Sequence, residues 1–331
     1  MVSIITPVYN RAELLIETAQ SVFNQTYTNW EWIIVDDGSS TDCLHKLEIL
    51  ANQDQRIKLL KRTREPKGAC ACRNIGVEKA KGSYIIFLDS DDLLEPVCLG
   101  QRVKAMDSAP IIDFGIFPSL MFDKKPFDLG LWWNIDKDTD ELTRQFHQDA
   151  ICQTTGVMWR MDAFIRTGGW NEELHLWQDI ELFLRVYIQD YKYKKFFELP
   201  PDLHNRVNQS SLSRGIFFAI DKQLSRIKVI KLAVELLKKY HKIAYIREAR
   251  FITAEIISGL LRTQNYNEAT ALYVWAAEEK VINWGEMKKL KKMKMFYIFK
   301  LYKLRCGKKY ILKLNGIFST DSTVGILPYK N

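Results

Sequence analysis

The chain has 331 residues and a formal net charge of +8, and 47% of its residues are hydrophobic. This length suits one large α/β domain or two ordinary ones. No apolar run approaches the roughly 18 residues that span a bilayer, so we expect no membrane-spanning helix. The first predicted strand begins at Val2, which leaves no room for a signal peptide, and the six cysteines form no CxxC pair. We therefore expect a reduced, cytoplasmic compartment.

Strands and helices alternate in the first part of the chain. Strand-like runs are predicted at 2–10, 30–35 and 56–60, and the residues between the runs show helical apolar spacing. This alternation predicts an α/β fold with a mostly parallel sheet flanked by helices. No GxGxxG follows the first strand and no GxxxxGK[ST] occurs, so dinucleotide-binding Rossmann and P-loop functions lose their main support.

Next along the chain, the second strand ends in a loop that carries two acids. The run Asp36-Asp37-Gly38-Ser39-Ser40 can accept hydrogen bonds from a planar ring such as uracil, and its glycine allows close approach. Alternatively, it is a simple Asp-Gly turn in which Ser40 or Asp42 caps the next helix.

Three carboxylates follow a later apolar run, Tyr84 to Leu88. Asp89, Asp91 and Asp92 would lie at the carboxyl end of a buried strand, where open α/β sheets bind ligands. Clustered carboxylates repel one another, and Mg²⁺ or Mn²⁺ shared with substrate phosphates would offset that repulsion. Alternatively, Asp91 and Asp92 cap a helix predicted over 93–106. The residues alone leave both interpretations open.

Four segments together resemble the inverting family 2 glycosyltransferases of the GT-A fold. They are TPVYN at 6–10, VDDGS at 35–39, ACRN at 71–74 and LDSDD at 88–92. The resemblance implies a GT-A, Rossmann-like domain over 1–215, with a nucleotide-sugar-binding half (1–110) and an acceptor half with a flexible loop (111–215). Residues 216–331 then form an appended helical, basic C-terminal region. The implied activity is metal-dependent transfer of a sugar from a nucleotide-sugar, most simply a UDP-sugar, to a saccharide acceptor.

The resemblance also implies roles for individual residues on the donor side. Thr6, Pro7 and Tyr9 would line the nucleotide pocket, and Asp37 would accept the uracil N–H. Arg73 would offset the charge of the diphosphate or order the acid loops.

For the metal, the resemblance points to the pair of acids after the strand at 84–88. Asp89 would lie near the ribose hydroxyl and the metal, and Asp91 would bind the metal, Mg²⁺ or Mn²⁺. Asp92 would be either a water-mediated ligand or a helix cap.

On the acceptor side, the segments 154–160 and 168–173 look like the family's acceptor-binding region. The resemblance makes Asp179 the catalytic base, which removes the acceptor hydroxyl proton during inverting attack. Gln178 stands where the family usually has Glu, and Trp170 is the expected acceptor-site aromatic. Without the resemblance, Asp179 would be an ordinary first-turn helix acid.

The segment 204–213 resembles the flexible loop that folds over the donor. We expect Arg206 to contact phosphate, because a guanidinium matches phosphate oxygens. Asn208 stands where the family often has histidine, so Asn208, His204 or water would take that role.

Helices are predicted over 216–239, 245–261 and 268–279, followed by a lysine-rich amphipathic stretch at 287–302. Such a stretch suits an anionic membrane surface, although a solvated basic helix has the same pattern. The first interpretation predicts a peripheral enzyme on the inner membrane face that acts on a lipid-linked glycan in surface polysaccharide synthesis. No nucleic-acid-binding fold accompanies the charge, so we expect no nucleic-acid partner.

Two rival functions remain at this stage. A nucleotidyltransferase uses metal-binding acids on a similar sheet, but residues 6–11 lack the expected glycine-rich basic loop. A catalytically silent sugar-nucleotide-binding or scaffold protein is the other rival, because Gln178 and Asn208 depart from the family pattern.

Overall fold

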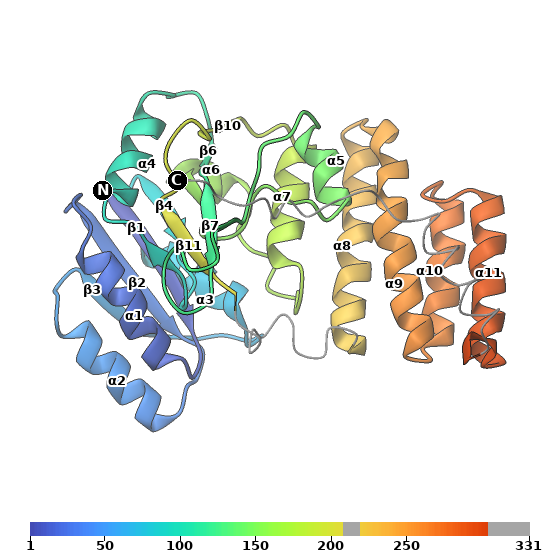
Figure 1. Cartoon of the computed structure of the whole chain (residues 1–331), viewed down its shortest axis with the longest axis horizontal. Coiled ribbons are helices and arrows are strands. Elements are labelled where there is room, and N and C mark those ends of the chain that lie inside the picture. The colour runs from blue at the N-terminus through green and yellow to red at the C-terminus, as the bar shows by residue number, and fades with distance from the viewer. Residues whose placement is uncertain (208–218, 304–331) are drawn as a thin grey trace.

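A computed structural model of the chain describes residues 1–207 and 219–303, and it places two sheets beside a row of helices (Figure 1). The larger sheet is parallel except for β9, which runs antiparallel to both β4 and β6. The predicted mostly parallel α/β sheet is therefore confirmed. Its seven strands, in spatial order, are β10 (Tyr193–Lys195), β6 (Phe114–Ile116), β9 (Val157–Arg160), β4 (Tyr84–Phe87), β1 (Val2–Val8), β2 (Trp30–Asp36) and β3 (Ile57–Lys61).

Both faces of this sheet are buried, because alternate residues of its central strands enter different cores. Ile85 and Phe87 belong to one core, and Ile86 and Leu88 belong to the other. The covering helices are α1 (Ala12–Phe23), α2 (Thr41–Ala51), α3 (Ala69–Lys79), α4 (Cys98–Asp107), α5 (Glu141–Phe146), α6 (Met161–Arg166) and α7 (Gln178–Ile188).

The smaller sheet has four short strands in the order β5-β11-β7-β8. These strands are β5 (Leu93–Leu94), β11 (Leu203–Arg206), β7 (Ser119–Phe122) and β8 (Leu131–Trp132). β11 pairs antiparallel with β5 and parallel with β7. Because β11 includes His204 and Arg206, the start of the segment predicted as a flexible loop is a strand.

The helix predicted over 93–106 begins later, at Cys98, and its N-cap is Val97. Leu93 and Leu94 instead pair with β11, and Pro96 disfavours helical backbone in the residue before it. The alternative in which Asp91 and Asp92 cap this helix is therefore wrong.

The C-terminal helical region stands beside α7, and Figure 1 shows its helices in a row. One apolar core runs continuously from Ile5 in β1 to Tyr297 in α11 (Trp284–Ile298). The expected boundary at 215/216 lies outside the described residues. No helix in the described ranges is long and apolar enough to cross a membrane. The elements are α8 (Ile220–Lys239), the 3₁₀ helix η1 (Ile243–Ala249), α9 (Arg250–Arg262), α10 (Tyr266–Glu278), α11 (Trp284–Ile298) and the 3₁₀ turn η2 (Leu301–Lys303).

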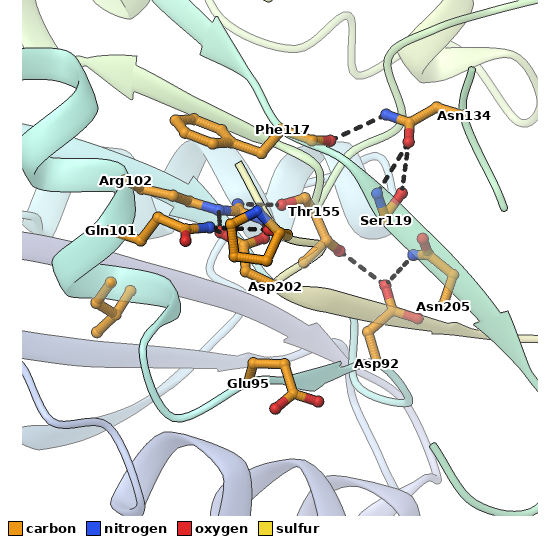
Figure 2. Close-up of polar contacts among 12 residues, drawn as sticks. Asp92, Glu95, Gln101, Arg102, Phe117, Ser119, Asn134, Thr155, Asp202 and Asn205 are labelled. Carbon is orange, nitrogen blue, oxygen red and sulfur yellow. Dashed lines mark hydrogen bonds and ion pairs between the residues drawn. The ribbon is translucent and has the colours of Figure 1, made fainter. Parts of the chain in front are cut away.

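A fully buried ion pair joins α4 to the chain just before β11 (Figure 2). The Arg102 guanidinium donates to both carboxylate oxygens of Asp202, at 2.6 and 3.0 Å. It also donates to the carbonyl oxygen of Thr155 at 2.7 Å, and Gln101 donates to Asp202 at 3.2 Å. These bonds connect α4 with the segments that precede β11 of the smaller sheet and β9 of the larger sheet.

Replacing Asp202 by Asn should destabilise the fold strongly, because Arg102 would keep a buried charge without its counter-ion. We expect a loss of about 3–5 kcal/mol in the free energy of unfolding, measured by urea denaturation. Glu198→Gln is the control, because Glu198 pairs with Lys194 at 3.9 Å on the exposed surface and should change little. Equal losses in the two variants would contradict this role for the buried pair.

Candidate active site

Two of the three acids after β4 are paired with arginines from neighbouring helices. Asp89 accepts a hydrogen bond from Arg73 on α3 at 2.7 Å, and Asp91 accepts one from Arg11, at the start of α1, at 2.6 Å. Burial raises the pKa of Asp91, and the nearby charge of Asp89 raises it further. The two ion pairs offset this repulsion and fix both carboxylates at one end of the sheet.

Asp92 has a different environment and serves as an anchor (Figure 2). Its carboxylate accepts hydrogen bonds from the Thr155 hydroxyl and the Asn205 amide at 2.8 Å, and from the Arg206 backbone N–H at 3.1 Å. Burial, together with the charges of Asp89 and Asp91, raises its pKa well above the usual range. Asp92 thus ties the acid loop to the smaller sheet, and its oxygens already have protein donors.

The loop after β2 combines a turn with an ion pair. Asp36 accepts a hydrogen bond from the N–H of Gly38, whose φ of +86° suits glycine, and Ser40 caps α2. Asp37 instead accepts one from Arg62 at 2.7 Å. The Asp-Gly turn and the Ser40 cap are therefore confirmed, while Asp37 lies beside them as a separate buried acid.

The other expected nucleotide-site residues lie at the carboxyl end of β1. The Thr6 hydroxyl is buried and accepts a hydrogen bond from the Trp32 indole at 2.9 Å, so that side chain holds β1 against β2. Pro7 is half-buried, and Tyr9 is exposed with the Lys67 ammonium 3.4 Å from its ring centroid. Of the three residues, Tyr9 offers a ring to a ligand.

Asp179 is the second residue of α7, and its side chain is half-buried. Burial raises its pKa, although the N–H of Ile180 at 2.9 Å and the charge of Arg73 act in the opposite direction. Arg73 also donates to the Gln178 amide oxygen at 3.5 Å. One arginine therefore connects Asp89 with the start of the helix that carries Asp179.

Trp170 lies in the core, which differs from the expected acceptor-binding surface. Its side chain is 3% exposed, and its ring packs edge-on against Phe87, with centroids 5.2 Å apart. The Arg73 guanidinium lies 4.7 Å from the same ring. Because an indole buries a large apolar area, packing takes up the faces that a sugar would need.

Arg206 lies beside the acid loop, whereas His204 does not. The Arg206 guanidinium donates to the backbone oxygen of Asp91 at 3.0 Å and pairs with Glu17 at 2.5 Å. His204 is buried and bonded to Glu95 at 2.5 Å, which is a packing role. Asn208, one of the expected substitutes for the family histidine, lies outside the described residues.

Sequence reasoning missed Arg11 and Arg62, the partners of Asp91 and Asp37. Both follow a strand of the parallel sheet closely, since β1 ends at Val8 and β3 ends at Lys61. The carboxyl ends of adjacent parallel strands meet at one edge. A basic residue just beyond such an end was the signal that could have placed each arginine beside its acid.

The acids fit a cation that is shared with substrate. Asp89 and Asp91 supply hard oxygen ligands, which suit Mg²⁺ or Mn²⁺. Among the described residues, no group of three or more His, Cys, Asp or Glu side chains could hold a metal ion alone. Mg²⁺ sites commonly use one or two carboxylates together with substrate phosphates, so two acids are sufficient.

A mostly parallel sheet with a second small sheet and acids at its carboxyl edge defines a GT-A glycosyltransferase fold. A model of glycosyl transferase family 2 matches residues 3–168, and the chain belongs to this family. The expected family and enzyme class are thereby confirmed.

Curated relatives match over shorter segments. An uncharacterized glycosyltransferase of Rickettsia conorii is 48% identical over 106 residues, which cover 32% of this chain and 17% of that protein. The Escherichia coli enzyme UDP-Glc:alpha-D-GlcNAc-diphosphoundecaprenol beta-1,3-glucosyltransferase WfgD is 45% identical over 28% of this chain and 36% of its own. The putative teichuronic acid biosynthesis glycosyltransferase TuaG of Bacillus subtilis is 35% identical, over 37% of this chain and 56% of its own. The matched segments thus span 17% to 56% of these relatives, which is less than two thirds of their length.

Solved structures with the same fold extend over nearly the whole chain. S. aureus TarS 1-349 in complex with UDP superposes with a TM-score of 0.64 at 15% identity, covering 96% of this chain and 90% of that one. The mannosyltransferase PcManGT from Pyrobaculum calidifontis, in complex with GDP-Man and Mn²⁺, gives a TM-score of 0.54 at 17% identity, over 96% and 84%. At these identities the likeness establishes the fold.

Asp179→Asn should make the protein more stable at neutral pH. The folded state raises the pKa of this acid, so it binds the proton more tightly than the unfolded chain does. The wild-type charge therefore lowers stability as pH rises above the ordinary Asp value of about 3.9. Urea denaturation from pH 3 to 8 should show the variant's advantage appear as the pH rises above about 4 and level off once the pH exceeds the raised, folded-state pKa.

Asp162→Asn is the matched control, because Arg166 lowers the pKa of this exposed acid. Asp162→Asn should therefore lower the free energy of unfolding slightly, whereas Asp179→Asn should raise it. A loss of stability in Asp179→Asn that is independent of pH would contradict a raised pKa at Asp179.

Proposed function

We propose that this family 2 enzyme inverts configuration as it transfers a sugar from a UDP-sugar to a saccharide acceptor. The observation that carries the proposal is the position of Arg73. Arg73 pairs with Asp89 at 2.7 Å and donates a hydrogen bond to Gln178 at 3.5 Å. The same side chain therefore contacts an acid of the proposed donor site and the first residue of α7, the helix that carries the proposed base. An inverting transfer needs both groups on opposite sides of one anomeric carbon.

Asp179 is the proposed base. As the acceptor oxygen forms its bond to the anomeric carbon, the hydroxyl proton passes to the Asp179 carboxylate, and the bond from that carbon to the diphosphate oxygen breaks. A raised pKa suits this task, because a carboxylate nearer to neutral pH is a stronger base. Gln178 in place of the family's Glu leaves this proton transfer intact, since the amide is bound to Arg73 and to the Leu174 carbonyl.

On the donor side, Asp37 and the exposed ring of Tyr9 are proposed to bind the nucleotide, with Pro7 and the backbone of Thr6 beside them. Arg73 and Arg206 are proposed to face the diphosphate, because guanidinium groups match phosphate oxygens. Asp89 and Asp91 would hold Mg²⁺ or Mn²⁺. When bound, the cation would supply positive charge to the leaving diphosphate.

The names of similar proteins support the choice of donor and acceptor. WfgD is named for a UDP-glucose donor and a diphosphoundecaprenol-linked acceptor, and TuaG for teichuronic acid biosynthesis. TarS was solved with UDP and PcManGT with Mn²⁺. We infer a lipid-linked glycan acceptor and a role in surface polysaccharide synthesis.

Titration calorimetry of UDP tests the donor site. Wild-type protein should bind UDP more tightly with Mn²⁺ than without, and Asp91→Ala should lose this metal dependence because it removes a carboxylate ligand. Asp162→Ala, an exposed acid on α6, is the control and should match the wild type. Equal UDP affinity with and without Mn²⁺ would contradict the metal role, and absence of UDP binding would contradict the donor.

We further propose that α11 contacts an anionic membrane from the cytoplasmic side. Lys288, Lys289 and Lys291 are exposed on this helix. Its first residue, Trp284, and the residue that follows it, Phe299, are aromatic side chains that are 64% and 63% exposed. α11 is the last helix of the row in Figure 1. Lysines attract anionic headgroups, while aromatic side chains favour the interface.

Replacing Lys288, Lys289 and Lys291 by Gln should weaken flotation with anionic vesicles on the order of 100-fold, at about 1 kcal/mol for each lysine. The control replaces the exposed Lys79, Lys81 and Lys104 by Gln, which removes the same charge from the sheet domain. An equal loss of vesicle binding in both triple variants would mean that net charge alone causes the binding, and it would contradict a specific contact through α11. Equal flotation of the wild type with neutral and anionic vesicles would overturn the proposal.

A further inference from the structure

The turn that leads into α7 has a backbone conformation that needs support. Trp177 lies immediately before the helix with φ +65° and ψ 33°, in the left-handed region that bulky residues rarely adopt. Such a residue costs on the order of 1–3 kcal/mol and persists only where its surroundings hold it. Asp179 lies two positions further on, so the conformation of this turn sets where its carboxylate points.

Ser225 of α8 holds the backbone of this turn. Its buried hydroxyl accepts hydrogen bonds from the N–H groups of His175 and Leu176, at 3.1 and 3.2 Å. It donates to the Leu176 carbonyl at 2.9 Å. One side chain of the C-terminal helical region thus bonds three backbone groups within four residues of Asp179. Two of these groups belong to the buried Leu176 and would lose a partner without it.

Arg226, the next residue of α8, holds the side chain of the same turn. It is fully buried, and its guanidinium lies 4.1 Å from the centroid of the Trp177 ring. It pairs with Glu255 of α9 at 3.0 Å and donates to Gln223 at 3.3 Å. A cation over the face of an indole is a favourable contact, and it is stronger where water is excluded.

From the opposite side, the turn is connected to the donor-side acids. Gln178 donates to the Leu174 carbonyl at 2.9 Å and accepts from Arg73, which pairs with Asp89. The turn is therefore fixed between α8 and the proposed donor site. A displacement of α8 would therefore move the turn at Trp177 and change the position of the Asp179 side chain.

We propose that Ser225 and Arg226 are positioning residues for the transfer reaction. They act through Trp177 to hold the carboxylate of Asp179 in place, and this makes the C-terminal helical region part of the catalytic unit. The inference rests on the proposed function, in which Asp179 is the base.

The first test measures the turn itself and needs no substrate. Hydrogen exchange of the full-length protein, followed by mass spectrometry, should show faster exchange in peptides covering 174–182 for Ser225→Ala. Lys228→Ala is the control on the same helix, since Lys228 pairs with Glu173 at the exposed surface. Unchanged exchange in Ser225→Ala would overturn the proposal.

The second test measures turnover as UDP release from UDP-glucose with Mn²⁺, with and without saccharide acceptors. Ser225→Ala and Arg226→Met should lower kcat about 10- to 100-fold, as expected for a misplaced catalytic group, with KM for the donor within about twofold. Ser225→Thr, which keeps the hydroxyl, and Lys228→Ala should retain most of the wild-type kcat. Where Ser225→Ala fails to fold, Ser225→Cys replaces it, because a thiol fills the space but bonds weakly.

The outcomes separate this inference from the function on which it rests. Loss of stability with unchanged kcat in Ser225→Ala, or a raised donor KM with unchanged kcat, would overturn the positioning role alone. Asp179→Asn with nearly wild-type turnover would overturn the proposed base, and the positioning role with it. Loss of turnover in Asp179→Asn and Ser225→Ala, with donor affinity kept in both, supports the two proposals together.

Discussion

Repulsion among Asp89, Asp91 and Asp92 is the constraint on which the rest of the site depends. Three carboxylates within four positions end a buried strand, and each one has a different partner. Arg73 of α3 pairs with Asp89, Arg11 pairs with Asp91, and donors from the smaller sheet and the segment before β9 bind Asp92. Because those partners come from distant parts of the chain, the acid loop has its charges compensated only when both sheets and helices α1 and α3 are packed.

The same compensation prepares the site for an anionic ligand. In the proposed function, a donor diphosphate with its cation would exchange the existing ion pairs of Asp91 and Asp89 for new ones, so little additional charge would be buried uncompensated. Asp92 would keep its three hydrogen bonds through that exchange, because its donors bind its own carboxylate while Arg73 and Arg11 pair with the other two acids. In this proposal, Asp92 keeps the loop in place while Asp89 and Asp91 change their ion-pair partners.

The sequence predicts the first half of the fold well, because long apolar runs and helical spacing there are consistent with tertiary packing. The sequence-based prediction is wrong at β5 and β11. Strands of two to four residues are too short to show an alternating apolar pattern, and they form only because a partner strand lies beside them. The three acids of the loop could be found from the sequence, but Arg11 was not assigned to Asp91, nor Arg62 to Asp37 of the loop after β2. The members of each pair meet only through the register of adjacent parallel strands. The burial of Trp170 depends in the same way on Phe87 and Arg73, which lie far from it along the chain.

The sequence around Asp179 departs most clearly from ordinary backbone and burial preferences. This is also where α7 of the sheet domain packs on α8 of the C-terminal helical region. A carboxylate with a raised pKa follows a tryptophan in the left-handed region, and each feature is unfavourable taken alone. Both persist because α8 packs on α7, within a core that continues from Ile5 to Tyr297. A division of the chain near residue 216 follows the family pattern, but the physical unit that holds Asp179 crosses it. A change that loosens α8 therefore acts on the geometry of the site as well as on the stability of the helices.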